Sequence, residues 1–147
     1  MHQKHLIDKV LITLEVGDKT SLFILLARDG TIDRKGDGSM NELPLHRGIS
    51  TQRHFDALMM TIDESIFNYS GVMRKANPAG KQCTLTIIFQ GAGGIDYSFR
   101  VIYGADSEGP PRELVEILIN AVKLTEEWYQ EQLSAPVEKE KSWKFWK

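Results

Sequence analysis

The sequence predicts an α+β fold in which two helices cover one mostly antiparallel sheet of about five strands, forming a two-layer sandwich. Two groups of strand-like segments are separated by a stretch with helical periodicity, and a second helical stretch follows them. A length of 147 residues with 41% hydrophobic content fits a single domain with one core. The expected order along the chain is therefore βββαββα.

The first three strands are expected between residues 9 and 34. Segment 9–16 alternates apolar and polar residues, and segment 20–28 is an almost continuous apolar run. An Asp-Gly turn at 29–30 lets segment 31–34 pair back, because glycine accepts a positive φ. These segments predict a meander, followed by a long surface loop over 36–48. The apolar row of the first strand is Val10, Ile12, Leu14 and Val16.

A helix is expected to begin at Ser50 or Thr51 and to end at a C-cap provided by Gly71. Its apolar residues recur at three- and four-residue steps, which is typical of a helix packed on a sheet. They are Phe55, Leu58, Met59, Ile62, Ile66 and Tyr69. Segments 82–90 and 96–103 follow, rich in β-branched and aromatic residues and joined by a glycine-rich loop, so they predict a hairpin.

Residues 112–133 predict a second helix, because the proline pair before them is tolerated in a first turn and no breaker follows. Its later turns are rich in glutamate and glutamine, so we expect the helix to leave the core partway along. The domain is expected to span 8–134, between a flexible N-terminus at 1–7 and a charged linker with an aromatic tail at 135–147. The helical stripe consists of Leu114, Ile117, Leu118, Ala121, Thr125 and Trp128.

Net charge, cysteine content and the length of apolar runs limit the classes of partner and the cellular compartment that the sequence favours. The chain has 18 Lys and Arg against 20 Asp and Glu, so no global field attracts nucleic acid or an acidic membrane. Cys83 is the only cysteine, which excludes an internal disulfide and favours a reducing compartment. The first residues lack the apolar stretch of a signal peptide, and no apolar run is long enough to span a bilayer. These features predict a cytoplasmic protein.

No motif predicts a cofactor or a metal. Two glycine-rich segments lack the third glycine of the dinucleotide fingerprint and the lysine of the P-loop. Asp29, Asp33 and Asp37 fall four residues apart, whereas a calcium loop requires ligands two apart. Its sixth and twelfth places, counted from Asp29, hold Arg34 and Met40 instead of glycine and glutamate. We therefore expect turn-forming aspartates and no cofactor.

The histidines and the cysteine offer little catalytic chemistry. Cys83 with His46 or His54 is the only nucleophile and base pairing available, and strand alternation predicts that Cys83 is buried and unreactive. His54 lies near a helix N-terminus, which lowers the pKa of an imidazole, and we expect it to be exposed. His2 and His5 could hold an adventitious metal in a fraying terminus.

The last seven residues form an unusual segment in which aromatic side chains alternate with lysines. Trp143, Phe145 and Trp146 have no core role in a tail, and Lys144 and Lys147 lie beside them. Such a segment can anchor in a groove on a partner protein, sit in a membrane interface, or stack on single-stranded nucleic acid. It can also dock on its own domain.

These observations favour a non-catalytic binding or regulatory module that acts through protein–protein contacts, with a homo-oligomer left open and nucleic acid not expected. Carboxylate pairs such as Glu113 and Glu116 are expected on solvated helix faces. An alternative is a small enzyme or ligand-binding domain whose loops 36–48 and 104–109 meet at one end of the sheet. A third alternative is membrane or single-stranded nucleic-acid association through the tail. The polar residues of the loop site would be Asp29, Asp33, Asp37, His46, Arg47 and Asp106.

Overall fold

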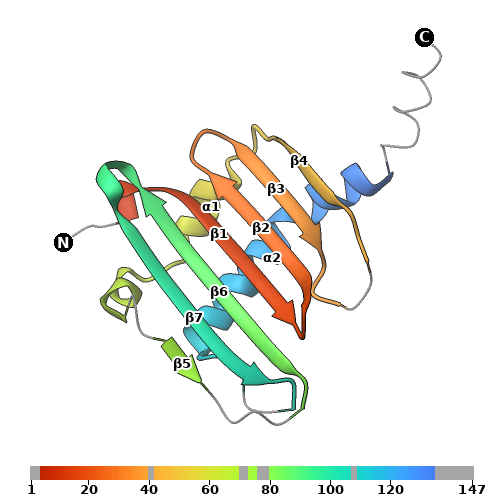
Figure 1. Cartoon of the computed structure of the whole chain (residues 1–147). Helices are drawn as coiled ribbons and strands as arrows, with labels where there is room; N and C mark the ends of the chain where they lie inside the picture. Colours follow the sequence, from red (N-terminus) through yellow and green to blue (C-terminus); the bar gives the residue numbers. More distant parts are fainter. Residues whose placement is uncertain (1–3, 40–41, 70–72, 76–79, 107–108, 135–147) are drawn as a thin grey trace.

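The computed structural model describes residues 4–39, 42–69, 73–75, 80–106 and 109–134. One sheet carries helices on a single face, which confirms the predicted α+β two-layer sandwich (Figure 1). The strands are β1 (Ile7–Val16), β2 (Lys19–Ala27), β3 (Thr31–Gly36), β4 (Leu45–Ile49), β5 (Met73–Lys75), β6 (Gln82–Gly91) and β7 (Asp96–Gly104). The helices are α1 (His54–Met60) and α2 (Arg112–Ser134), with short 3-10 turns η1 (Lys4–Leu6), η2 (Glu64–Tyr69) and η3 (Ala92–Gly94).

The strands are arranged in the order β4-β3-β2-β1-β6-β7-β5. The first six are antiparallel to their neighbours, and the short β5 adds to the edge parallel to β7. The predicted meander of β1, β2 and β3 and the predicted hairpin of β6 and β7 are both confirmed. Pairing of β1 with β6 joins these two units into a single sheet.

Strand alternation places the core between the sheet and the helices. Ile12 on the central strand lies opposite Ile24 on one side and Ile87 on the other, and all three are fully buried. Burial of each such side chain contributes about 2 kcal/mol. From the helical layer, Phe55 and Ile117 close this interior. The sequence pattern therefore fixes which face of each strand meets the helices.

The long surface loop predicted after β3 contains a strand, so that prediction is wrong in its second half. β4 pairs antiparallel with β3, with Asp33 opposite Arg47 and Ile32 opposite Gly48. The inward row of β4 is a histidine and a glycine, and thus no apolar row marks the strand. A Cβ added to Gly48 would lie 3.0 Å from a ring carbon of Trp128, so the packing of α2 favours a small residue here.

The first predicted helix is divided into two. α1 ends at Met60, and η2 begins after a three-residue break. Lys4, expected in a flexible N-terminus, donates from Nζ to the carbonyl oxygens of Met59 (3.1 Å) and Ile62 (2.8 Å). A cation at this position satisfies carbonyl groups that the helix leaves free and favours its end there. The predicted cap Gly71 lies outside the described residues.

α2 stays on the sheet into its last turns, so the prediction that it leaves the core partway along is wrong. Thr125, Trp128 and Tyr129 are all buried. Glu126, expected in water, pairs with the buried Arg34 of β3. In the described part of the chain, no helix combines the length and apolar character that crossing a bilayer requires.

Candidate functional site

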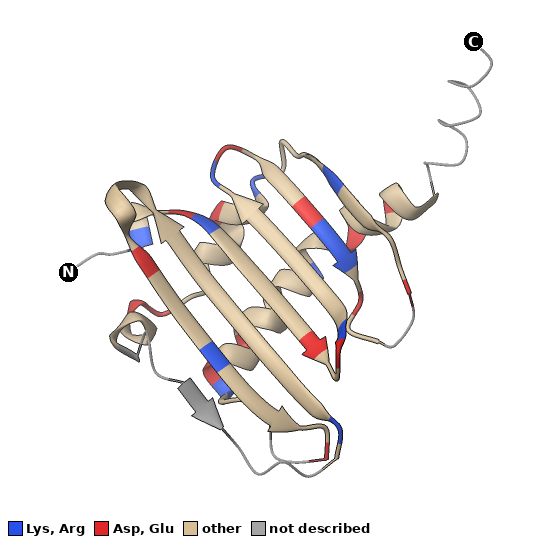
Figure 2. Cartoon of the chain, viewed as in Figure 1, with Lys and Arg blue, Asp and Glu red and all other residues tan. Residues whose placement is uncertain are grey.

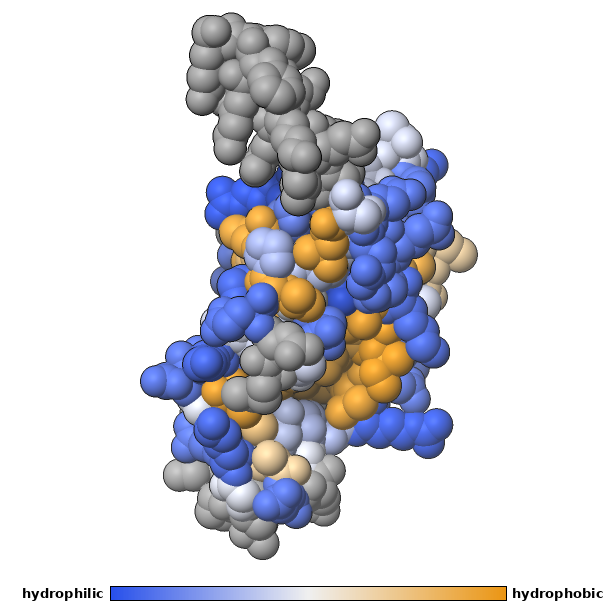
Figure 3. Space-filling view, turned by 90° about the vertical axis from the view of Figure 1, so that its right-hand side faces the viewer, coloured by the Kyte–Doolittle hydropathy of each residue, from blue (hydrophilic) through white to orange (hydrophobic). Residues whose placement is uncertain are grey.

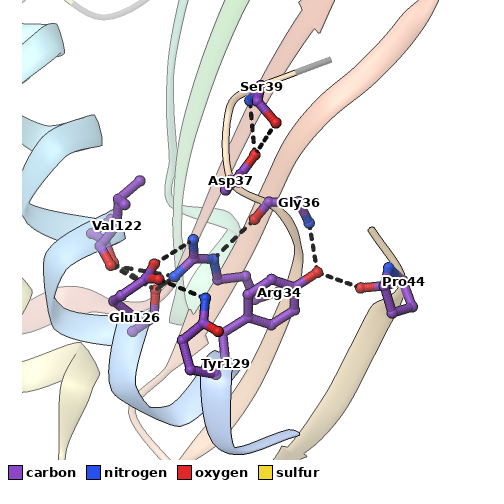
Figure 4. Close-up of polar contacts among 11 residues, drawn as sticks. Arg34, Gly36, Asp37, Ser39, Pro44, Val122, Glu126 and Tyr129 are labelled. Carbon is purple, nitrogen blue, oxygen red and sulfur yellow. Dashed lines mark hydrogen bonds and ion pairs between the residues drawn. The ribbon is translucent and has the colours of Figure 1, made fainter. Parts of the chain in front are cut away.

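A buried arginine attaches the C-terminal half of α2 to the sheet (Figure 4). Arg34 is fully buried on the inward row of β3. Its Nε donates to the carbonyl oxygen of Gly36 (3.2 Å), and Nη1 donates to Oγ1 of Thr125 (3.2 Å) and to the carbonyl oxygen of Val122 (3.4 Å). Nη2 lies 2.9 Å from the Glu126 carboxylate. Nε and Nη1 therefore have hydrogen-bond partners among the described residues, and Nη2, which has none there, has the Glu126 carboxylate as its ion-pair partner.

Tyr129 completes this cluster. Its ring lies under the guanidinium, with the Arg34 Cζ atom 4.6 Å from the ring centroid. The phenol donates to the carbonyl oxygen of Pro44 (2.6 Å) and accepts from the Gly36 amide (2.8 Å). Because these groups already bind one another, the cluster is a structural clamp that leaves little polar capacity for a ligand.

A groove of about 380 Å³ lies at the other half of α2, between that helix, β7 and the segment that connects α1 to η2. Its apolar floor comes from all three: Ile62, Ile66, Phe99, Val101, Leu114 and Ile117. These side chains are recessed, with 8% or less of their surface exposed. The clamp fixes the helix that forms one wall, so the groove belongs to the stable layer of the fold.

Three acidic residues surround this floor. Asp63 lies on the η2 side, and Glu113 and Glu116 lie on α2, all exposed. Figure 2 shows acidic segments at the start of η2 and at the start of α2. The Ser65 amide donates to Asp63 Oδ1 (3.0 Å), and this bond lowers the pKa of the Asp63 carboxyl. Arg112 lies 2.9 Å from Glu116, an exposed pair that offsets only part of the negative charge.

The groove combines apolar side chains on its floor with carboxylates at its rim. Its lining contains neither histidine nor cysteine. Because its pKa is lowered, Asp63 is a poor proton donor or acceptor near neutral pH. An apolar floor with a carboxylate rim suits a ligand that carries an apolar group beside a cation.

Two further apolar surfaces lie outside the groove. On the open face of the sheet, Leu11 lies between Leu25 and Ile88, and charged residues lie on the outer strands (Figure 2). On the helical layer, seen from the β4 edge, apolar residues gather in patches between hydrophilic ones (Figure 3). Met60 (83% exposed) and Ile119 (44%) project from that layer. Both surfaces suit flat protein contacts, whereas the groove combines a recessed floor with a charged rim.

The six residues of the predicted loop site lie at separate places. Asp33 and Arg47 meet across β3 and β4, with 3.8 Å between Oδ2 and Nε. Asp29 and Asp37 flank β3 and accept amide hydrogen bonds from residues 31 and 39, at 2.9 Å each. The Ser39 hydroxyl, followed by the Ser39 amide, lowers the pKa of the Asp37 carboxyl. The Thr31 amide lowers the pKa of the Asp29 carboxyl. The two aspartates thus form turns.

Of the other two residues, His46 is the chain neighbour of Arg47 but faces the other side of the sheet, and Asp106 follows a distant strand. The His46 ring lies 6.0 Å from that of Tyr129, on the inward side of β4. Asp106 follows β7, and the order of the sheet places four strand steps, about 19 Å, between β7 and β3. The loops after β3 and β7 leave the same end of the sheet but lie on either side of its centre.

The cysteine prediction is confirmed in part, and one histidine prediction is wrong. Cys83 is buried, with Sγ 3.6 Å from the Lys81 carbonyl oxygen. His54 is 8% exposed, not solvated as predicted, and burial lowers the pKa of its imidazole. Among the described residues, no three His, Cys, Asp or Glu side chains form a metal cluster. His2 and the tail residues lie outside the described part of the chain.

Sequence reasoning missed both Arg34 and the groove. The groove walls come from segments about fifty residues apart, and their acidic residues resemble ordinary solvated helix positions. Comparison with protein-family models, curated proteins and solved structures found no match to this chain. Its class is thus defined by the fold and the site alone: a two-layer α+β domain with an acid-rimmed apolar groove on its helical layer.

Proposed function

We propose that this protein is a non-catalytic, cytoplasmic binding module whose groove takes a short segment of a partner protein. The segment carries one or two aromatic side chains beside lysine or arginine. The observation that carries this proposal is the combination of a recessed apolar floor with Asp63, Glu113 and Glu116 at its rim. Burial of the single cysteine is consistent with the cytoplasmic part of the proposal.

The size of the groove supports a peptide-sized ligand. A volume of about 380 Å³ falls within the range that holds a drug-sized group. Two aromatic side chains that each bury about 200 Å² contribute about 10 kcal/mol. Association costs of about 4 kcal/mol leave about 6 kcal/mol, which corresponds to a Kd on the order of 30 µM.

The rim argues against phosphate-bearing ligands at this site. Nucleic acid and acidic lipid headgroups carry the same sign of charge as the three carboxylates, and their approach costs free energy. A basic segment gains attraction to the same groups. The charge of the rim therefore selects a cationic protein segment over nucleic acid.

Fluorescence anisotropy with labelled model peptides tests this function on the chain ended after Ser134. The described strands and helices end there, so its melting temperature should match that of the full chain. We expect a five-residue peptide that alternates lysine with tryptophan and phenylalanine to bind with a Kd near 30 µM. Peptides with glutamate for lysine, or alanine for the aromatics, should bind at least tenfold more weakly.

Two charge-matched variants localise the binding. Glu113→Gln with Glu116→Gln should weaken it about tenfold, since each lost attraction contributes somewhat under 1 kcal/mol. Asp18→Asn with Asp96→Asn removes the same charge from exposed positions outside the groove and should leave Kd unchanged. Equal effects of the two pairs, or equal binding of the acidic peptide, would contradict the proposal.

A further inference from the structure

The tail has the composition that the groove requires. Its last seven residues contain three aromatic side chains, Trp143, Phe145 and Trp146, and three lysines. The groove offers a recessed apolar floor and three carboxylates. Aromatic rings beside ammonium groups match such a floor and rim in both polarity and sign of charge. The chain thus encodes both halves of a complementary pair.

The length of the linker fits this pairing within one chain. α2 ends at Ser134, and Ile117 of the groove floor lies seventeen residues earlier, a rise of about 26 Å along the helix. The nine residues from 135 to 143 reach about 30 Å when extended. A linker that runs back along α2 therefore brings Trp143 to the level of the groove.

Acidic residues lie along the required path. At 100° per residue, Glu113, Glu116, Glu127 and Glu131 fall within an arc of about 60° on α2, and all four are exposed. Lys123 is near the edge of this arc. Two carboxylates at the tail end of the helix and two at the groove make a track that attracts a lysine-bearing segment.

We infer that residues 142–147 fold back along α2 of the same chain and occupy the groove, with the aromatic side chains on the floor and the lysines at the rim. This inference rests on the proposed function, because it names the resident occupant of the same site. A partner segment must then displace the tail. A short linker gives the tail an effective concentration of about 1 mM at the groove. With a Kd of about 30 µM, the groove is occupied by the tail about thirty times more often than it is free.

Peptide affinity of the full chain tests this inference. The basic aromatic peptide should bind the full chain about thirtyfold more weakly than the chain ended after Ser134. Alanine at Trp143, Phe145 and Trp146 together should restore the tighter binding. Equal binding to the full and shortened chains would overturn the fold-back and leave the proposed function standing. No binding to the shortened chain would overturn both.

Tryptophan emission gives a second readout that needs no peptide. Trp128 is buried, so changes on perturbation report Trp143 and Trp146. Glu113→Gln with Glu116→Gln should shift emission of the full chain to the red, while Asp18→Asn with Asp96→Asn should not. Ile119→Ser, on the opposite side of α2 from Ile117, should also leave emission unchanged. A red shift in this variant would show that the tail binds the surface around Ile119 instead of the groove, and it would overturn the inference.

Two more measurements distinguish other occupants. Sedimentation at increasing concentration should show a monomer with constant emission, whereas a dimer whose emission shifts to the blue as it forms would place the tail in a second copy. Emission that is red in the free chain and moves to the blue only with phosphatidylserine vesicles or an oligothymidine would assign the tail to membranes or nucleic acid. Either result overturns folding back within one chain.

Discussion

Replacing Glu126 with glutamine is expected to cost more stability than removing the arginine that it pairs with. Arg34 is fully buried, whereas the side chain of Glu126 is 44% exposed. In Glu126→Gln the guanidinium stays inside the protein with no opposite charge, because arginine does not release its proton. In Arg34→Met the carboxylate can turn toward water, and an unbranched apolar side chain fills the space.

The size of each loss of stability follows from how deeply Arg34 and Glu126 are buried. Removing one member of a buried pair costs about 3–5 kcal/mol, and partial exposure of the carboxylate reduces this to about 2 kcal/mol. Arg34→Met loses the hydrogen bonds to Gly36 and Thr125 but leaves no buried charge, so we expect a loss of about 1 kcal/mol. The double variant should match Arg34→Met within about 0.5 kcal/mol, which gives a coupling of about 2 kcal/mol.

Urea unfolding at pH 7 measures these free energies, with thermal melts as a check. A loss of about 2 kcal/mol corresponds to roughly 6 °C in Tm for a chain of this size. Glu127→Gln is the matched control, because that neighbour is exposed and should change stability by less than about 0.5 kcal/mol. A greater loss for Arg34→Met than for Glu126→Gln would refute the reasoning and show that hydrogen bonds outweigh the uncompensated charge.

Three other predictions test the packing around the sheet. Gly36→Ala should cost about 3 kcal/mol or more in urea unfolding, because its Cβ would lie 2.2 Å from the Ser21 carbonyl oxygen at a φ of +81°. Gly38→Ala, at +89° in open space, should cost only about 1–2 kcal/mol, and equal losses would exclude crowding as the cause. Tyr129→Phe should cost about 2 kcal/mol, since an amide and a carbonyl lose their shared partner; an unchanged Tm would contradict this. Burial lowers the pKa of His54, so the unfolded chain binds a proton first as pH falls, and stability should decrease between about pH 7 and pH 5. His54→Gln should remove this part of the decrease in urea unfolding at the two pH values.

The sequence predicted the elements whose signal lies in local periodicity. β1, β2, β6 and β7 alternate or carry β-branched runs, and short turns such as 29–30 connect them, so their pairing follows from neighbours in the chain. The stripe of α2 was equally clear. Pairing of β1 with β6 is not local, yet it is required once two half-sheets must share one core.

The errors fall where tertiary partners decide the structure. β4 faces inward with His46 and Gly48, because Trp128 of α2 occupies the space that an apolar side chain would fill. Arg34 sits on an inward row because residues of α2 accept its hydrogen bonds, and no pattern near position 34 indicates them. α1 ends where Lys4 reaches its last carbonyl groups, a contact across more than fifty residues. Each of these partners lies far along the chain from the residue that it contacts, so local sequence patterns do not indicate the contact.

The two halves of α2 have different roles: the C-terminal half, with the clamp, stabilises the fold, and the N-terminal half, with the rim, serves the proposed binding. The clamp at residues 122–129 is buried, so changes there should alter folding while leaving the rim charges intact. The rim carboxylates Glu113 and Glu116 are exposed, and replacing them should cost little stability, because exposed charges contribute little to folding. The wall of the groove opposite this rigid helix is the short 3-10 turn η2. It directly follows Asp63, which accepts a hydrogen bond from the Ser65 amide. One fixed wall and one short turn can accommodate aromatic side chains of different size, and a variant of the rim that loses affinity without losing Tm would therefore report on the site itself.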